Sequence, residues 1–259
     1  MTLIDQAQAD IHPYTREMAM IHRIFRRESR LMTTLVAAVP AGDTDRAAVL
    51  SGAWHLYVLG LHVHHTGEDE LLWPPLRPRL TPDEAGRLAL MEAQHQALDE
   101  GLTWITALME RWTADPSEAT RSALVAALRD HHDLLCAHLD AEESTVMPLV
   151  AAYIGPEQWR AVGERGLAET PRHRLMIALG AILEDASASE RAEFLGRLPL
   201  PARLLWRLAG RRQYCREMHR VRGALAEAPP TGVAAGPAAD AVASAPAGSA
   251  QRPGASGPC

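Results

Sequence analysis

The sequence predicts an all-α protein, built on an up-down-up-down four-helix bundle with additional C-terminal helices and a disordered tail. Three observations support this fold class. Apolar residues recur every three or four positions along four long segments within residues 10–155. Aromatic residues make up only 5% of the chain, and no run alternates apolar and polar residues as a half-buried strand would. Short connections between the four segments favour antiparallel neighbours.

The first two segments form a predicted helical hairpin. The first helix runs from about Tyr14 to Pro40, where Pro, Ala and Gly follow one another. The second begins after Asp43 and should stop at Pro74–Pro75, because proline lacks the amide hydrogen that a helix interior needs.

The last two segments form a second hairpin. The third helix opens with Thr81-Pro-Asp-Glu84, a capping box with proline at the first helical position. Asp115-Pro-Ser-Glu118 should start the fourth helix in the same way, and Pro148 lies near its end.

From Pro156 the pattern changes to shorter helical pieces. The last of them, Ala202 to about Arg222, is rich in arginine and amphipathic. We expect its apolar side to pack against the bundle, with contact to a membrane surface as the alternative. After about Glu227 the residues are almost all small or proline, which predicts disorder. The predicted divisions are therefore a bundle at 10–155, a helical extension at 156–225 and a disordered tail at 226–259.

Composition places limits on the class of protein. The formal net charge is −6, so the global charge does not indicate a nucleic-acid partner. No stretch approaches the ~20 apolar residues of a membrane-spanning helix, and the N-terminus lacks the apolar run of a secretory signal. Three scattered cysteines fit a reducing compartment better than a disulfide scaffold. We therefore predict a cytoplasmic protein, and make no prediction of its oligomeric state.

Polar side chains interrupt the apolar stripes of all four predicted helices. A buried imidazole or carboxylate without a partner costs several kcal/mol, and a shared metal centre removes this cost for all of them. In an antiparallel bundle the starts of the first and third helices meet the ends of the second and fourth, so these groups should converge near one end. The candidate metal ligands are His22, His64, Glu68, His95, His138 and Glu142.

An internal repeat supports two metal ions. His64-x-x-x-Glu68 with Pro74 matches His138-x-x-x-Glu142 with Pro148, position for position. Each pair has i, i+4 spacing, which places both side chains on one helix face. Two facing pairs form a pseudo-symmetric dinuclear site if each Glu bridges to a second ion. Mixed imidazole and carboxylate ligands suit iron, manganese or zinc.

These segments, together with the residues around His22 (Met20–Glu28), resemble the hemerythrin-like, or HHE cation-binding, domain. The resemblance covers about residues 10–155 and implies a four-helix bundle with a non-haem di-iron site. Oxygen-carrying members have a fifth histidine in a His-x-x-x-His pair on the third helix. Here Met91 stands four residues before His95 and Asp99 four after it. Asp99, Glu92 or water takes the vacant place, which disfavours reversible oxygen storage.

The resulting hypothesis is a di-iron protein that binds or turns over O2, H2O2 or NO, with enzymatic turnover left open. One alternative is a metal- or oxygen-responsive sensor that signals through the C-terminal helices. Another is a bundle with a purely structural zinc. Asp69 and Glu143 are expected to orient the ligands, and His65 is expected to be exposed. We expect Tyr57 to serve in packing and His131 to make a core hydrogen bond.

Overall fold

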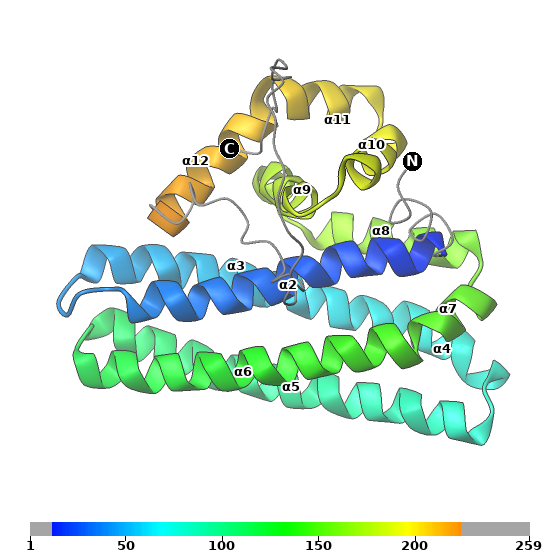
Figure 1. Ribbon diagram of the computed structural model, residues 1–259, viewed down its shortest axis with the longest axis horizontal. Coiled ribbons are helices and arrows are strands. Elements are labelled where there is room, and N and C mark those ends of the chain that lie inside the picture. Colours follow the sequence, from blue (N-terminus) through cyan, green and yellow to red (C-terminus); the bar gives the residue numbers. More distant parts are fainter. Residues whose placement is uncertain (1–11, 224–259) are drawn as a thin grey trace, which may run out of the picture.

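The structure is a computed structural model of the chain, and it describes residues 12–223. All regular secondary structure in this range is helical, which confirms the predicted all-α class. Four long helices lie side by side, and a layer of shorter helices covers one side of them (Figure 1). The predicted disordered tail, 226–259, lies outside the described residues.

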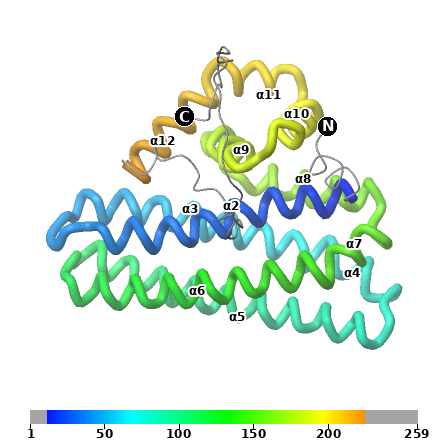
Figure 2. Tube along the Cα trace, viewed as in Figure 1, coloured from blue at the N-terminus to red at the C-terminus, as the bar shows by residue number. Residues whose placement is uncertain are grey.

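The four long helices form the predicted up-down-up-down bundle. Neighbours along the chain run in opposite directions (Figure 2). The bundle closes on itself because α2 packs against α6 as well as against α3, while α5 packs against both α3 and α6. Its helices are α2 (Pro13–Ala37), α3 (Thr44–Gly67), α5 (Pro82–Ala114) and α6 (Glu118–Thr145).

The helix starts follow the capping signals in the sequence, with one difference. Thr81 caps α5 through the predicted capping box. Helix α6, however, is capped by Ser117, whose hydroxyl accepts from the Thr120 amide, and not by Asp115. Asp115 instead closes α5 as its C-cap, and the Pro116 carbonyl accepts the Gly42 amide from the neighbouring hairpin. The two helices are therefore joined by a tighter turn than predicted.

The second helix continues through Pro74–Pro75, where the sequence predicted it to stop. Beyond α3 it becomes a π-helical segment, η1 (Glu68–Leu72), followed by α4 (Trp73–Leu76) and the 3-10 turn η2 (Arg77–Arg79). The wider turn lets the Trp73 amide reach back to the Glu68 carbonyl, and the prolines then occupy the first turn of α4, where their missing amides cost little. Glu68 therefore opens a π-helical turn.

The bundle core consists of two apolar clusters with a polar layer between them. The larger includes Trp54, Leu61, Leu98 and Leu135, and the smaller includes Met18, Leu72, Trp73, Met91 and Val146. Along every long helix the predicted ligands lie between a residue of one cluster and a residue of the other. The polar layer is thus sealed by apolar side chains on both sides.

Helix α7 follows α6 at the end of the bundle, and the helices after it form the C-terminal layer (Figure 1). Helix α8 packs on α3 and η1, α9 packs on α2, and α12 packs on α9 and α3. Between residues 12 and 223, no helix combines the length and apolar character needed to cross a bilayer. The elements are α7 (Met147–Tyr153), α8 (Pro156–Glu169), η3 (Arg172–Arg174), α9 (Leu175–Glu184), α10 (Ala188–Arg197), α11 (Leu200–Leu205), η4 (Trp206–Gly210) and α12 (Arg211–Arg222).

The predicted arginine-rich helix differs from expectation in its orientation. It comprises α11, the π-helical η4 and α12. Tyr214 is buried as predicted for the apolar side, and Val221 is buried as well. Leu204, Leu205 and Leu208 instead remain 48%, 51% and 70% exposed. The α12 part therefore packs its apolar side against the protein, whereas the leucines of α11 and η4 face solvent.

Candidate metal centre

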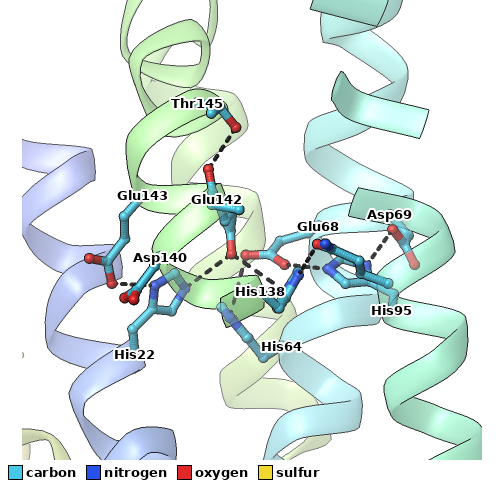
Figure 3. A network of polar contacts seen from close by, with 12 residues as sticks. His22, His64, Glu68, Asp69, His95, His138, Asp140, Glu142, Glu143 and Thr145 are labelled. Atoms are coloured by element: carbon cyan, nitrogen blue, oxygen red, sulfur yellow. Dashed lines mark hydrogen bonds and ion pairs between the residues drawn. The ribbon is translucent and has the colours of Figure 1, made fainter. Parts of the chain in front are cut away.

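The structure brings all six predicted ligands together in the polar layer of the bundle (Figure 3). Each of the four long chain segments contributes. Five of the six residues are at most 2% exposed, and the side chain of His64 is 8% exposed. This burial matters because it removes the water that would otherwise satisfy their polar atoms.

The side chains form two groups, each compact enough to hold one ion. His22, His64, Glu68 and Glu142 make up the first group, and His65, His95 and His138 make up the second. Within each group the candidate ligand atoms lie within 4.8 Å of one another. The first group mixes imidazole with carboxylate, whereas the second contains three imidazoles.

Each carboxylate belongs to the first group and also lies near a histidine of the second. Glu68 is 3.5 Å from Nε2 of His64 in the first group and 3.5 Å from Nε2 of His95 in the second. Glu142 Oε2 is 3.3 Å from His22 Nε2 and 3.9 Å from His138 Nε2. The pseudo-symmetry of the sequence repeat is therefore present in space, with two carboxylates that can each reach both positions.

Hydrogen bonds from outside the polar layer orient three of the imidazole rings. His22 Nδ1 lies 2.8 Å from Glu143 Oε1, and His95 Nδ1 lies 2.9 Å from Asp69 Oδ1. His138 Nδ1 lies 3.0 Å from the amide oxygen of Gln94. Each acceptor requires the proton on Nδ1, which leaves the lone pair of Nε2 directed into the site. Asp69 and Glu143, which follow Glu68 and Glu142 in sequence, thus occupy the orienting positions expected of them.

Glu143 is held in turn by an arginine. Arg26 donates to Glu143 Oε1 at 2.7 Å and to Asp140 at 2.6 Å. This guanidinium balances the charge of Glu143 without contacting the inner ligands. Gln94 and Arg26 were not identified from the sequence, since neither interrupts an apolar stripe.

The inward-facing atoms fit a cation site. Within residues 12–223, Nε2 of His22, His64, His95 and His138 has no hydrogen-bond partner, and the same holds for both oxygens of Glu68 and of Glu142. Such unpartnered buried groups are rare in folded proteins and each costs free energy. All of these atoms are Lewis bases, and they converge on one another. The donor set therefore has the chemistry of a cation site.

Burial and mutual charge shift the ionisation of these groups. Burial and the facing Glu142 raise the pKa of Glu68 well above its ordinary value. Burial would also raise the pKa of Glu142, but His22 and the other imidazoles lower it. Burial lowers the pKa of His64 well below its usual range and that of His138 to about 4. These two imidazoles are therefore neutral near pH 7, as a metal ligand must be.

His22 is the exception among the imidazoles. Burial would lower its pKa, but the adjacent Glu142 and Glu143 raise it to about 8. Without a cation, a proton on His22 therefore offsets the charge of Glu142. A bound metal ion would take over that role and release the proton.

The sequence-based expectation for His65 is wrong. Its side chain is 1% exposed and stacks on His95, and neither ring nitrogen has a hydrogen-bond partner in the described part of the chain. After Leu61 the apolar stripe can continue three or four residues later, at position 64 or at position 65. In the structure the side chains at both positions point into the bundle. His64 turns toward His22, and His65 turns toward His95 and His138. The His64-His65 pair was the available signal.

His65 brings a fifth histidine to the candidate ligand groups, from α3 and not from the third helix of the bundle. Glu92 pairs with Arg77 away from the site, and neither it nor Asp99 belongs to the candidate ligand groups of the described residues. Met91 lies in the smaller apolar cluster. One heptad along the bundle, the Tyr57 hydroxyl lies 2.7 Å from His131 Nε2, so Tyr57 makes a hydrogen bond as well as packing.

The comparison with known families agrees with this architecture. The model of the hemerythrin HHE cation-binding domain matches residues 14–150, more than half of the 259-residue chain. No curated protein and no solved structure matches the chain. The matched stretch contains every residue of both candidate ligand groups.

Proposed function

Because this chain belongs to the hemerythrin HHE cation-binding domain family, we propose that it holds two iron ions and binds or reacts with a small oxidant or diatomic ligand such as O2, H2O2 or NO. The observation that carries the proposal is the placement of Glu68 and Glu142. Each carboxylate lies within 3.9 Å of one histidine of the first group and one histidine of the second. Two carboxylates in such positions suit a pair of cations better than a single one.

The ligand count favours reactive ions over structural ones. Five imidazoles and two bridging carboxylates supply about nine ligand atoms, whereas two six-coordinate ions need about twelve. Bound iron would supply redox chemistry at the remaining positions. A structural zinc would be closed by four ligands, and seven convergent side chains exceed that requirement.

The protein side chains have distinct roles in this proposal. Glu68 and Glu142 neutralise part of the cation charge, while Asp69, Glu143 and Gln94 hold three imidazoles in the tautomer that presents Nε2. If Glu68 and Glu142 were each shared between the two ions, the first ion would have two imidazoles and the second three, so the first would have more room for an exogenous ligand. Apolar neighbours exclude water: Phe25 packs on His64 with ring centroids 5.0 Å apart.

Metal analysis and ligand titration test the proposal. The chain, expressed in iron-rich medium, should contain about two iron ions, as measured by plasma mass spectrometry, and show the near-ultraviolet absorbance of protein-bound iron. Anaerobic reduction followed by titration with O2, H2O2 and NO should change that spectrum. Less than about one iron per chain, or stable zinc occupancy without such absorbance, would overturn it.

A sensor function is the second candidate, and one contact favours it. Helix α8 packs against the π-helical segment that begins at Glu68, and Val162 lies 3.6 Å from where a Cβ on Gly67 would stand. A metal-dependent shift of Glu68 would therefore reach the C-terminal layer. Hydrogen exchange of α8 should differ between the iron-loaded and metal-free protein if this coupling operates, and be identical if it does not.

A further inference from the structure

The outermost part of the C-terminal layer presents leucines to solvent. Leu200, Leu204, Leu205 and Leu208, here called the outer leucine face, are 61%, 48%, 51% and 70% exposed. They lie on α11 and η4, which stand away from the bundle in Figure 1. Grouped exposed leucines are unusual on a soluble domain and indicate an interaction surface.

Packing on the opposite side fixes this orientation. A Cβ on Gly210 would lie 2.7 Å from the Trp206 ring and 2.8 Å from the Met176 sulfur, so the segment approaches α9 closely at that glycine. This close contact is possible because Gly210 has no side chain. A rotation that turned the leucines inward would break the contact between Gly210 and α9.

The same stretch is strongly basic. No acidic residue occurs between Glu193 and Glu217, although the whole chain has a net charge of −6. Six arginines lie between those two residues: Arg197, Arg203, Arg207, Arg211, Arg212 and Arg216. The local charge is therefore opposite in sign to that of the whole chain.

Four of these arginines form no ion pair with any described residue: Arg203, Arg207, Arg212 and Arg216. Arg212 donates to the Leu208 carbonyl, and Arg216 donates to the Arg212 carbonyl. Arg222, in contrast, is buried and pairs with Glu28 and Glu184. The arginines near the leucines thus remain available to an external anion.

We propose that this surface docks on a membrane rich in anionic phospholipid. The outer leucine face would enter the headgroup and acyl-chain boundary, while Arg207 and Arg212 contact lipid phosphates. An interfacial helix combines these features: apolar side chains facing outward and arginines flanking them. The bundle would then lie parallel to the bilayer with its metal centre remote from the lipid.

The alternation of the two residue types favours lipid over other partners. A nucleic acid would engage the arginines but would leave four leucines in contact with phosphate and water. A symmetric pairing of two copies would cover the leucines but would also bring their arginines together, at a cost in repulsion. Anionic lipid satisfies both the apolar area and the charge.

Vesicle flotation of the full-length protein tests the proposal. The protein should float with vesicles containing about one-third phosphatidylglycerol, fail to float with pure phosphatidylcholine, and be released by high salt. Arg207→Gln/Arg212→Gln should weaken partitioning roughly 25-fold, because each basic residue near an anionic surface contributes a factor of about five. Leu204→Gln/Leu208→Gln should weaken it roughly tenfold or more.

Matched variants on the bundle and on α8 serve as controls. Arg87→Gln/Arg129→Gln removes the same charge from exposed positions, and Leu90→Gln/Leu167→Gln removes leucines that are 54% and 61% exposed. Both controls should bind vesicles like the original chain. Circular dichroism and metal content should be the same for all four variants.

Several outcomes would overturn the proposal. These are absence of vesicle binding by the full chain, equal loss in test and control variants, or binding that survives the leucine changes. Nucleic-acid binding that needs the arginines but not the leucines would point to another partner. A concentration-dependent dimer lost in Leu204→Gln/Leu208→Gln, without vesicle binding, would assign the surface to a second copy. Vesicle binding only after removal of residues 224–259 would assign it to that segment.

Discussion

His65 and His95 lie face to face, with ring centroids 4.1 Å apart and ring planes inclined by only 11°. Two stacked buried imidazoles cannot satisfy each other, because neither presents a hydrogen to the other's lone pair. His65 has no hydrogen-bond partner at either nitrogen among the described residues, and it belongs to a three-histidine group that could hold a metal ion.

Replacing His65 should therefore remove one ion and leave the other. His65→Leu keeps the volume roughly constant, and we expect iron to fall from about two per chain to about one. The metal-free protein should be no less stable than the original, since an unsatisfied imidazole is removed. His62→Leu, at an exposed position on the same helix, is the control. Retention of both ions in His65→Leu would remove His65 from the ligand set.

Replacing one of the two facing carboxylates should make the metal-free protein more stable and weaken its metal binding. Glu68→Gln removes one of two buried acids that face each other, so the metal-free protein should unfold at higher urea concentration, by about 1–3 kcal/mol in the free energy of unfolding. The same change should abolish binding of the second ion. Denaturation and metal analysis of Glu68→Gln and Glu142→Gln measure both effects. Destabilisation of the metal-free protein by both changes would show that the carboxylates support the fold without a cation.

Tyr57 and His131 should contribute to stability and not to metal binding. Their hydrogen bond is buried, and burial lowers the pKa of His131 to about 4, so the ring is neutral and accepts from the phenol. Tyr57→Phe leaves His131 Nε2 unpartnered and should cost about 1–3 kcal/mol. Tyr57→Phe/His131→Leu should recover part of that loss. The half-exposed Tyr153→Phe is the control, and iron content should not change in any of the three.

The bundle could be predicted from sequence because its signals are periodic. Each ligand interrupts an apolar stripe that continues on both sides, so His22 and His95 stand out against their neighbours. His65 did not stand out in this way. A stripe with steps of three or four residues does not show which of two adjacent residues faces the core. The π-helical turn at Glu68 was also hidden. This turn depends on how two prolines are accommodated within a continuing helix. From the sequence alone, a helix that ends at the prolines is an equally good prediction.

The orientation of the arginine-rich segment could not be predicted from the sequence, for a different reason. An amphipathic pattern identifies an apolar side but does not say what covers it. Here the close approach at Gly210 turns the Trp206 side toward the protein, and the leucines face outward. A contact of this kind depends on tertiary packing between α9 and η4, which no local pattern encodes.

Gly180 should be indispensable for the contact between α9 and α12. A Cβ there would lie 2.2 Å from the Tyr214 ring, and Tyr214 is buried. Gly180→Ala should therefore destabilise the protein by about 1–3 kcal/mol, as overpacking does. Gly163→Ala, in α8 with no atom within 4 Å of the new Cβ, should instead stabilise by about 0.4–1 kcal/mol. Urea denaturation measures the free energy of unfolding of both variants. Equal changes in Gly180→Ala and Gly163→Ala would mean that α9 and α12 can move apart without cost.

Docking of the C-terminal layer should weaken in acid. Glu184 receives hydrogen bonds from Arg222 and from the Tyr214 hydroxyl, which lies 2.6 Å away. Burial would raise the pKa of Glu184, but Arg222 and Arg27 more than offset this and lower it. A carboxyl with a lowered folded-state pKa contributes stability above its ordinary value of 4.5, and that stability is lost as the pH falls through the folded-state value.

Glu184→Gln should consequently be less stable than the original chain at pH 7 and vary less with pH below about 4.5. The two stability curves should converge as the pH falls through the lowered folded-state pKa of Glu184, below which the original carboxyl is also protonated. Urea denaturation across this range measures the difference, and Glu157→Gln, at an exposed position in α8, provides the control. A constant gap between Glu184→Gln and the original chain at every pH would show that Glu184 acts through packing and not through its charge.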